Sequence, residues 1–234
     1  FRAMAKALAF GVPRVVVAGS VALAAAERAV RFDPENAADP RYAEGYADAI
    51  CGLELAAATL RLLRHADDPA WLRLLMTTLW VVNGQAALDA PKARRVPLPD
   101  AEAIAQTWDH GPELAKLQAR VLAGEPERAI AVLRGYLLMA LPVQPLCQQL
   151  LAVGFEDLHS APAGQLLAAR ALAAGVEVFS TLGENPHREL ALCGAIRLAA
   201  APLAPPGPHN LGLAVLDRIE GRAPPTVRTP RLWT

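Results

Sequence analysis

Apolar residues recur along this chain at intervals of three and four, the spacing that places them on one face of an α-helix. The clearest stripe falls within residues 41–64 and consists of Tyr42, Tyr46, Ile50, Leu53 and Ala57. A second falls within residues 70–88 and consists of Trp71, Leu74, Leu75, Leu79, Val82 and Ala86. Alternation of apolar and polar residues, which would indicate a β-strand, never extends beyond four residues. The pattern therefore predicts an all-α protein.

Three of the predicted helices begin with the same signal, a capping side chain followed by proline. Asp39-Pro40, Asp68-Pro69 and Asn185-Pro186 each precede an apolar run with helical period. A short acidic or amide side chain can bind the first free N–H groups of a helix, and proline is tolerated in the first turn. These signals predict helices over 41–64, over 70–88 and from 185–186 to about residue 200.

The same reasoning predicts six more helices, over 15–31, 100–108, 112–123, 126–139, 146–158 and, as a last short helix, 211–219. A further helix should follow Ser160, with Pro162 in its first turn. We therefore expect an all-α multi-helix bundle of about eight to ten helices. The alternative is a short α-solenoid, because residues 124–140 resemble the second half of a helical-hairpin repeat, although no 34-residue recurrence accompanies them.

The chain should form a single all-helical domain over residues 1–234. Its best internal boundary is the proline-containing stretch 91–99, PKARRVPLP, which cannot be helical throughout. Residues 223–234 contain three prolines and should form an extended tail. Near its end Leu232 and Trp233 are apolar enough to dock into a groove on this chain or on a second copy.

Charge and apolar content exclude several classes of partner. The 23 basic and 23 acidic residues balance, so the chain has no electrostatic footprint for nucleic acid or for an anionic membrane. The longest apolar run, residues 15–26, is shorter than the roughly 20 residues that cross a bilayer. Cys51, Cys147 and Cys193 are far apart and form no C-x-x-C pair, which predicts buried, reduced thiols and a cytoplasmic location.

The stretch 145–165 carries the densest chemistry, because Glu156, Asp157 and His159 interrupt an apolar helical run. Glu156 and His159 would share a helix face, as half of a carboxylate-histidine metal site does. No second half is apparent, and polar groups at a helix end are the commoner explanation. The sequence assigns no catalytic residue, cofactor or metal ligand. Its candidate ligand pocket consists of Tyr42, Tyr46, Asp48, Glu156, Asp157 and His159.

Several segments resemble the all-helical region found beside Rieske iron-sulfur domains in some bacterial proteins. They are residues 21–55, residues 70–99 with their LWVVNGQAALDAPKARRVPLP end, residues 124–165 with GEPERAIAVLRGYL and FEDLHSAPAGQ, and residues 185–200. The resemblance implies histidines that bind a metal or act in redox chemistry. This chain has Asp33 and Ala161 at two of those positions, with His159 displaced by two residues, and it lacks the C-x-H and C-x-x-H pairs of a Rieske cluster.

Two functional hypotheses remain. The first is a non-catalytic helical module that binds a small apolar molecule, a protein partner or a second copy of itself. The second is an oxidoreductase-like enzyme of specialised metabolism that uses the candidate pocket. Because most of the implied histidines are replaced, we expect no stoichiometric transition metal. Elemental analysis that found about one iron, manganese or zinc per chain would favour the enzyme.

Overall fold

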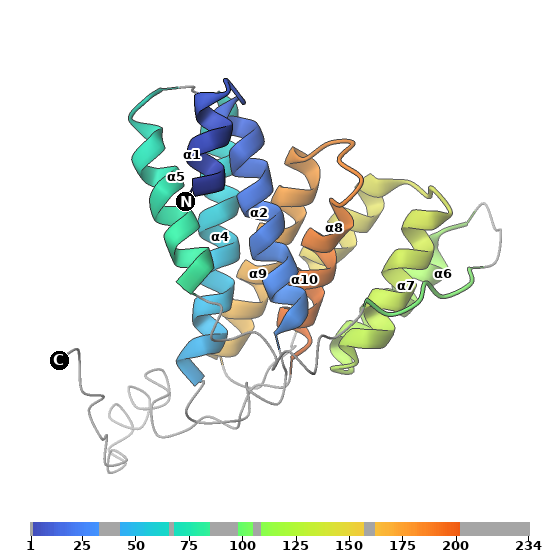
Figure 1. The fold of residues 1–234 in the computed structure, drawn as a ribbon. Helices are drawn as coiled ribbons and strands as arrows, with labels where there is room; N and C mark the ends of the chain where they lie inside the picture. Colours follow the sequence, from blue (N-terminus) through green and yellow to red (C-terminus); the bar gives the residue numbers. More distant parts are fainter. Residues whose placement is uncertain are drawn as a thin grey trace, which may run out of the picture.

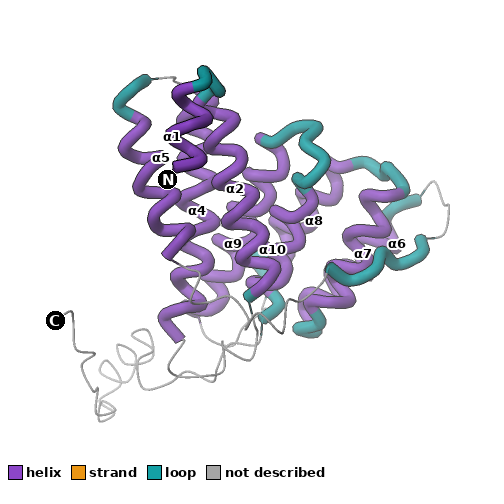
Figure 2. Tube along the Cα trace, viewed as in Figure 1, coloured by secondary structure: helices purple, strands orange, loops and turns teal. Residues whose placement is uncertain are grey.

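The computed structural model describes residues 2–32, 43–65, 68–84, 98–104, 109–156 and 162–201, and in these ranges it contains helices and no strands (Figures 1 and 2). The described helices are α1 (Arg2–Ala9), α2 (Arg14–Arg31), α4 (Ala43–His65), α5 (Trp71–Gly84), α6 (Gly111–Leu122), α7 (Pro126–Leu138), α8 (Val143–Val153), α9 (Pro162–Thr181) and α10 (Glu189–Ala199). The predicted all-α bundle of eight to ten helices is confirmed.

Four helices form the centre of the molecule. Helix α2 packs between α4 and α10, and α9 packs against the same two helices, so the four close into a ring. Helix α5 covers α4 and α2 on one side, and α1 lies on α2. On the other side α7 lies on α10, α8 lies on α9, and α6 bridges α7 and α8. Figure 1 shows α5 and α6 at opposite ends of this arrangement.

Small residues let the central helices approach closely. An added Cβ on Gly194 of α10 would lie 2.7 Å from the carbonyl oxygen of Ala26 and 2.8 Å from the Cβ of Ala29, both on α2. On α9, Gly175 faces Ala195 of α10 in the same way. The alanine-rich composition of these segments therefore serves helix contacts in which backbones nearly touch. The alanines at these contacts are buried, namely Ala26, Ala29, Ala191 and Ala195.

Two ion pairs between α4 and α9 show how these helices run relative to each other. Glu54 accepts two hydrogen bonds from the guanidinium of Arg170, one of them 2.6 Å long, and Arg61 lies 3.1 Å from Glu177. Since both pairs join α4 to α9 in the same order along the chain, the two helices are parallel. Their N-terminal ends consequently lie at the same end of the bundle.

Helix α8 ends earlier than the sequence predicts. We expected it to continue to residue 158, but it ends at Val153, and residues 154–156 form a turn. Gly154 is buried against α9, where an added Cβ would lie 3.1 Å from the Cα of Ala169. Gln165 of α9 donates hydrogen bonds to the carbonyls of Gly154 and Glu156, the first at 2.8 Å. These contacts satisfy carbonyls past the helix end and turn the chain toward α9.

The helix predicted over residues 100–108 is wrong for its described part, because residues 98–104 are not helical. This segment crosses α7 instead. The N–H of Glu102 donates a 2.9 Å hydrogen bond to the carbonyl of Ala131, and Arg134 donates to the carbonyl of Pro99. Gly135 makes the approach possible, since a Cβ there would overlap the Glu102 carbonyl. Packing of the extended backbone against α7 thus overrides the local helical signal.

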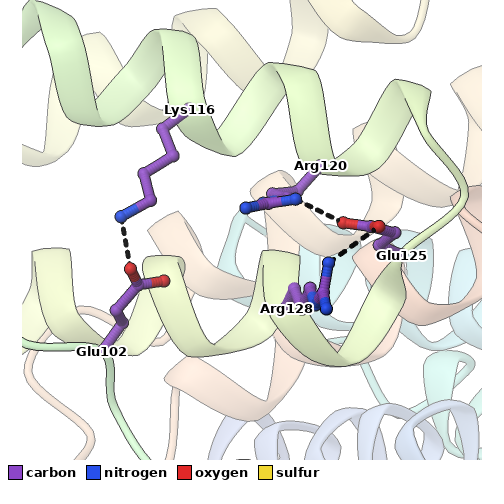
Figure 3. Close-up of polar contacts among 5 residues, drawn as sticks. All are labelled: Glu102, Lys116, Arg120, Glu125 and Arg128. Carbon is purple, nitrogen blue, oxygen red and sulfur yellow. Dashed lines mark hydrogen bonds and ion pairs between the residues drawn. The ribbon is translucent and has the colours of Figure 1, made fainter.

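Figure 3 shows two groups of ion pairs, one at this segment and one at the α6–α7 turn. Lys116 of α6 pairs with Glu102, which holds the segment against the helical hairpin. At the turn Glu125 accepts hydrogen bonds from Arg120 at 2.7 Å and from Arg128 at 3.0 Å. The two guanidinium groups, Arg120 first, hold the pKa of the Glu125 carboxyl below its usual range.

The other boundaries agree with the sequence to within a few residues. Within α2, Glu27 and Arg31 lie one turn apart and form an ion pair. Helix α10 begins at Glu189, because Asn185 first forms a turn in which its Oδ1 accepts the His187 N–H at 2.9 Å. Helix α1 was not predicted. The helix predicted over 211–219, the tail 223–234 with its docking, residues 85–88 of the second predicted helix and most of the 91–99 boundary lie outside the described residues.

Candidate functional site

The described part of the chain contains only a fraction of the sequence-predicted pocket. Tyr42, Asp157 and His159 lie outside the described residues, and Tyr46 is described only through its backbone in the first turn of α4. Asp48 is exposed on α4, and Glu156 is exposed three residues beyond the end of α8. Because α8 ends before Glu156, the helix face that Glu156 was expected to share with His159 is not part of α8.

The two described carboxylates nevertheless lie at one end of the bundle. Asp48 precedes Glu54 in α4, and Glu156 is bound through its carbonyl to Gln165, which precedes Arg170 in α9. Since Glu54 pairs with Arg170 and the two helices are parallel, both acidic residues belong to the end at which α4 and α9 begin. A pocket there stays a prediction.

The described ranges hold no group of three or more His, Cys, Asp or Glu side chains close enough to bind one metal ion. Of the helices in these ranges, none combines the length and the apolar composition that crossing a bilayer requires.

The three cysteines are free thiols with different surroundings. Cys193 is buried in α10, and desolvation raises its pKa to about 12. Cys147 is half-buried, and burial raises its pKa too, although a hydrogen bond with Ser180 opposes the shift. The prediction that all three are buried is wrong for Cys51, which is exposed with its Sγ 3.9 Å from Arg170.

An open pocket of about 510 Å³ lies where the α7–α8 corner faces the α9–α10 corner. Its apolar wall comes from the end of α7, the start of α8 and one ring of α9, and consists of Leu137, Leu138, Ala140, Leu141, Val143 and Phe179. Its polar wall comes from the α9–α10 turn and consists of Glu184, Asn185, Pro186, Arg188 and Glu189. We call this space the corner pocket. Its volume is within the range of small-molecule sites.

Arg188 is the most firmly held polar group of the corner pocket. Its Nη1 donates a hydrogen bond to the carbonyl of Gly183, and its guanidinium carbon lies 4.5 Å from the centre of the Phe179 ring. Phe179 itself is fully buried, so this cation–π contact is a fixed support for the guanidinium. In the described part of the chain no carboxylate forms an ion pair with Arg188.

The two glutamates of the pocket differ in their partners. Glu189 of α10 lies 3.7 Å from the Nε of Arg134 on α7, so the positive charge of Arg134 offsets the charge of Glu189. Glu184 is exposed in the α9–α10 turn and, within the described ranges, has no ion-pair partner. The pocket therefore presents a leucine-rich wall, one oriented cation and one solvated anion.

Helix periodicity alone does not reveal the corner pocket. Leu137, Leu138 and Leu141 read as ordinary core residues at a helix end, yet Leu138 is 71% exposed because α7 stops there and Ala140 turns the chain with a φ of 51°. The one local sequence signal for the pocket is the turn Glu184–Asn185–Pro186, and this signal can equally well be interpreted as the start of a helix.

Comparisons of the chain with protein-family models, with curated proteins and with solved structures gave no match in any of the three. The resemblance to the Rieske-associated helical region therefore stays a prediction, as do the histidine positions that it implies.

Proposed function

We propose that this chain is a helical binding module whose corner pocket takes a small apolar molecule. The observation that supports this proposal is a space of about 510 Å³ in which an apolar wall faces a polar wall with one firmly held group, Arg188. Leu138 contributes most to the argument, because a leucine 71% exposed beside Leu141 and Phe179 loses contact with water when an apolar ligand binds.

The neutral fluorescent probe N-phenyl-1-naphthylamine tests the proposal, since its emission rises when it leaves water. We expect saturable binding with one probe per chain. Leu138→Asn should weaken it at least severalfold, because the substitution removes apolar surface from the pocket without adding a charge. The matched control is Leu166→Asn, which changes a leucine that is 59% exposed on α9, away from the pocket.

Retention of full probe binding by Leu138→Asn, with a loss in Leu166→Asn, would place the apolar site elsewhere. Absence of saturable binding to the unmodified chain would refute the proposal.

A protein partner or a second copy of this chain is the second candidate, and one observation favours it. Met76 and Trp80 are one turn apart on the outer face of α5 and are 42% and 67% exposed. A large aromatic side chain beside an exposed methionine is typical of interface centres rather than of free surface.

Light scattering coupled to size-exclusion chromatography tests this second candidate with the full chain. We expect the unmodified protein to have the mass of a dimer at high concentration and Trp80→Ser to remain a monomer. Phe155→Ser is the control, because Phe155 is 86% exposed after α8, far along the chain from α5. A monomer at every concentration would eliminate self-association through α5.

A further inference from the structure

We propose that the ligand of the corner pocket carries a carboxylate, and that Arg188 binds it while the chain of the ligand lies along Leu137, Leu138 and Leu141. This inference rests on the proposed function and adds the chemical class of the ligand, an apolar acid.

The orientation of Arg188 is the first support. The hydrogen bond to Gly183 and the contact with the Phe179 ring hold the guanidinium beside the apolar wall before any ligand arrives. A guanidinium has five N–H donors, and the hydrogen bond to Gly183 uses one of its nitrogens. The remaining donors suit a carboxylate, which accepts two parallel hydrogen bonds from such a group.

The surroundings of Arg188 are the second support. It is half-buried and has no ion pair within the described ranges, so no carboxylate of that part of the chain offsets its charge. A carboxylate on the ligand would supply the ion-pair partner that Arg188 lacks among the described residues.

Two glutamates oppose an anion, and their positions determine how strongly. Glu189 lies next to Arg134, which offsets its charge. Glu184 is exposed, so water and salt screen it. The balance favours an anion at Arg188, and it predicts opposite effects of the two neutralising substitutions: Arg188→Gln weakens binding of an acid, whereas Glu184→Gln strengthens it.

The test is displacement of N-phenyl-1-naphthylamine from the full chain by two ligands with the same eight-carbon chain and opposite charge, octanoate and octylammonium, at pH 7 and low salt. The readout is the midpoint concentration of octylammonium divided by that of octanoate. Taking this ratio cancels changes in the affinity for the probe. We expect octanoate to act at roughly tenfold lower concentration, as a charge-assisted hydrogen bond allows. Arg188→Gln should bring the ratio near one, and Glu184→Gln should raise it about twofold.

Equal or better displacement by octylammonium would overturn this inference, even where the probe itself binds and the proposed function stands. So would an unchanged ratio in Arg188→Gln. If Arg188→Gln loses its fold, as circular dichroism would show, the ratio in the unmodified chain and the Glu184→Gln variant still decide. A ratio left unchanged by Glu184→Gln would mean that the charged groups of the ligands do not lie in the corner pocket, and it would overturn the inference. Failure of the probe to bind at all would instead remove the apolar site on which this inference depends.

Discussion

Arg197 is the most unusual single residue in the described part of the chain, because a full guanidinium is buried in the last turn of α10 with 1% exposure. Its Nη1 lies 3.0 Å from Glu127 of α7, but its Nε and Nη2 have no hydrogen-bond partner within the described ranges. Burying a charge with unsatisfied N–H groups costs free energy that one ion pair offsets only in part. Glu127 is itself 55% exposed, which weakens the attraction further.

This arrangement predicts that the two partners respond differently to substitution. Arg197→Met should leave the melting temperature unchanged or raise it, since a side chain of similar length replaces a buried charge. Glu127→Ala should destabilise the fold by about 1–2 kcal/mol, less than a fully buried pair would lose, because the remaining Arg197 charge is then uncompensated. Thermal unfolding of both variants and of the double variant provides the check. A larger loss for Arg197→Met than for Glu127→Ala would contradict the account.

The cysteines give a second prediction at this scale, which concerns reactivity. In the native protein iodoacetamide should modify exposed Cys51 first and half-buried Cys147 more slowly, with Cys193 protected until the chain unfolds. The folded-state pKa of Cys193, about 12, exceeds the ordinary thiol value, so folding favours the protonated form. The contribution of the protonated Cys193 thiol to the free energy of unfolding is complete below the ordinary thiol pKa, and it is lost as pH rises toward 12. Peptide mass spectrometry after timed labelling tests the order, and early modification of Cys193 would contradict it.

At the scale of the elements, the contact between α10 and α2 depends on a missing side chain. A Cβ on Gly194 meets the backbone oxygen of Ala26, which cannot move aside as a flexible side chain can. We expect Gly194→Ala to cost about 1–3 kcal/mol through overpacking, despite the better helix propensity of alanine. Gly84→Ala is the matched control, because Gly84 ends α5 with nothing within 4 Å of an added Cβ and should be neutral or slightly stabilising. Denaturant titration distinguishes the two, and equal midpoints would show that α10 can shift away from α2.

How well each element could be predicted depends on whether its signal is local. Pro126 and the Asp68-Pro69 pair are capping signals within one turn, and the helices after them, α7 and α5, begin within two residues of those signals. Residues 98–104 and the end of α8 could not be predicted in the same way. Their conformation depends on Gly135, Ala169 and Gln165, which are distant in sequence and become neighbours only when the helices pack.

On the scale of the whole molecule, the same distinction explains the site. The all-helical class follows from periodicity, which is a property of short windows, whereas the corner pocket exists because two helix corners far apart in sequence face each other across α7, α9 and α10. The predicted pocket joined two short stretches of chain, one that contains Asp48 and one that contains Glu156. The structure places those two at the end where α4 and α9 begin, and the corner pocket lies where α9 ends and α10 begins.

The closed ring of α2, α4, α9 and α10 predicts how the molecule opens. Residues 191–201 are all buried, and α10 packs against α2, α9 and α7, so its amides should exchange with solvent only when the whole fold unfolds. Helix α1 buries only Met4, and α2 is the one described helix with which it makes a substantial contact. Its amides should therefore exchange through local opening. Native-state hydrogen exchange in increasing denaturant measures the exchange free energies of α10 and α1.

We expect α10, α2 and α9 to share one exchange free energy equal to that of global unfolding, with α1 several kcal/mol below it. Leu8→Ala, which trims a half-buried contact of α1, should lower the value for α1 and leave that for α10 almost unchanged. Equal protection of α1 and α10 would mean that the outer helix belongs to the cooperative unit, and that the ring is not the part of the molecule that opens last.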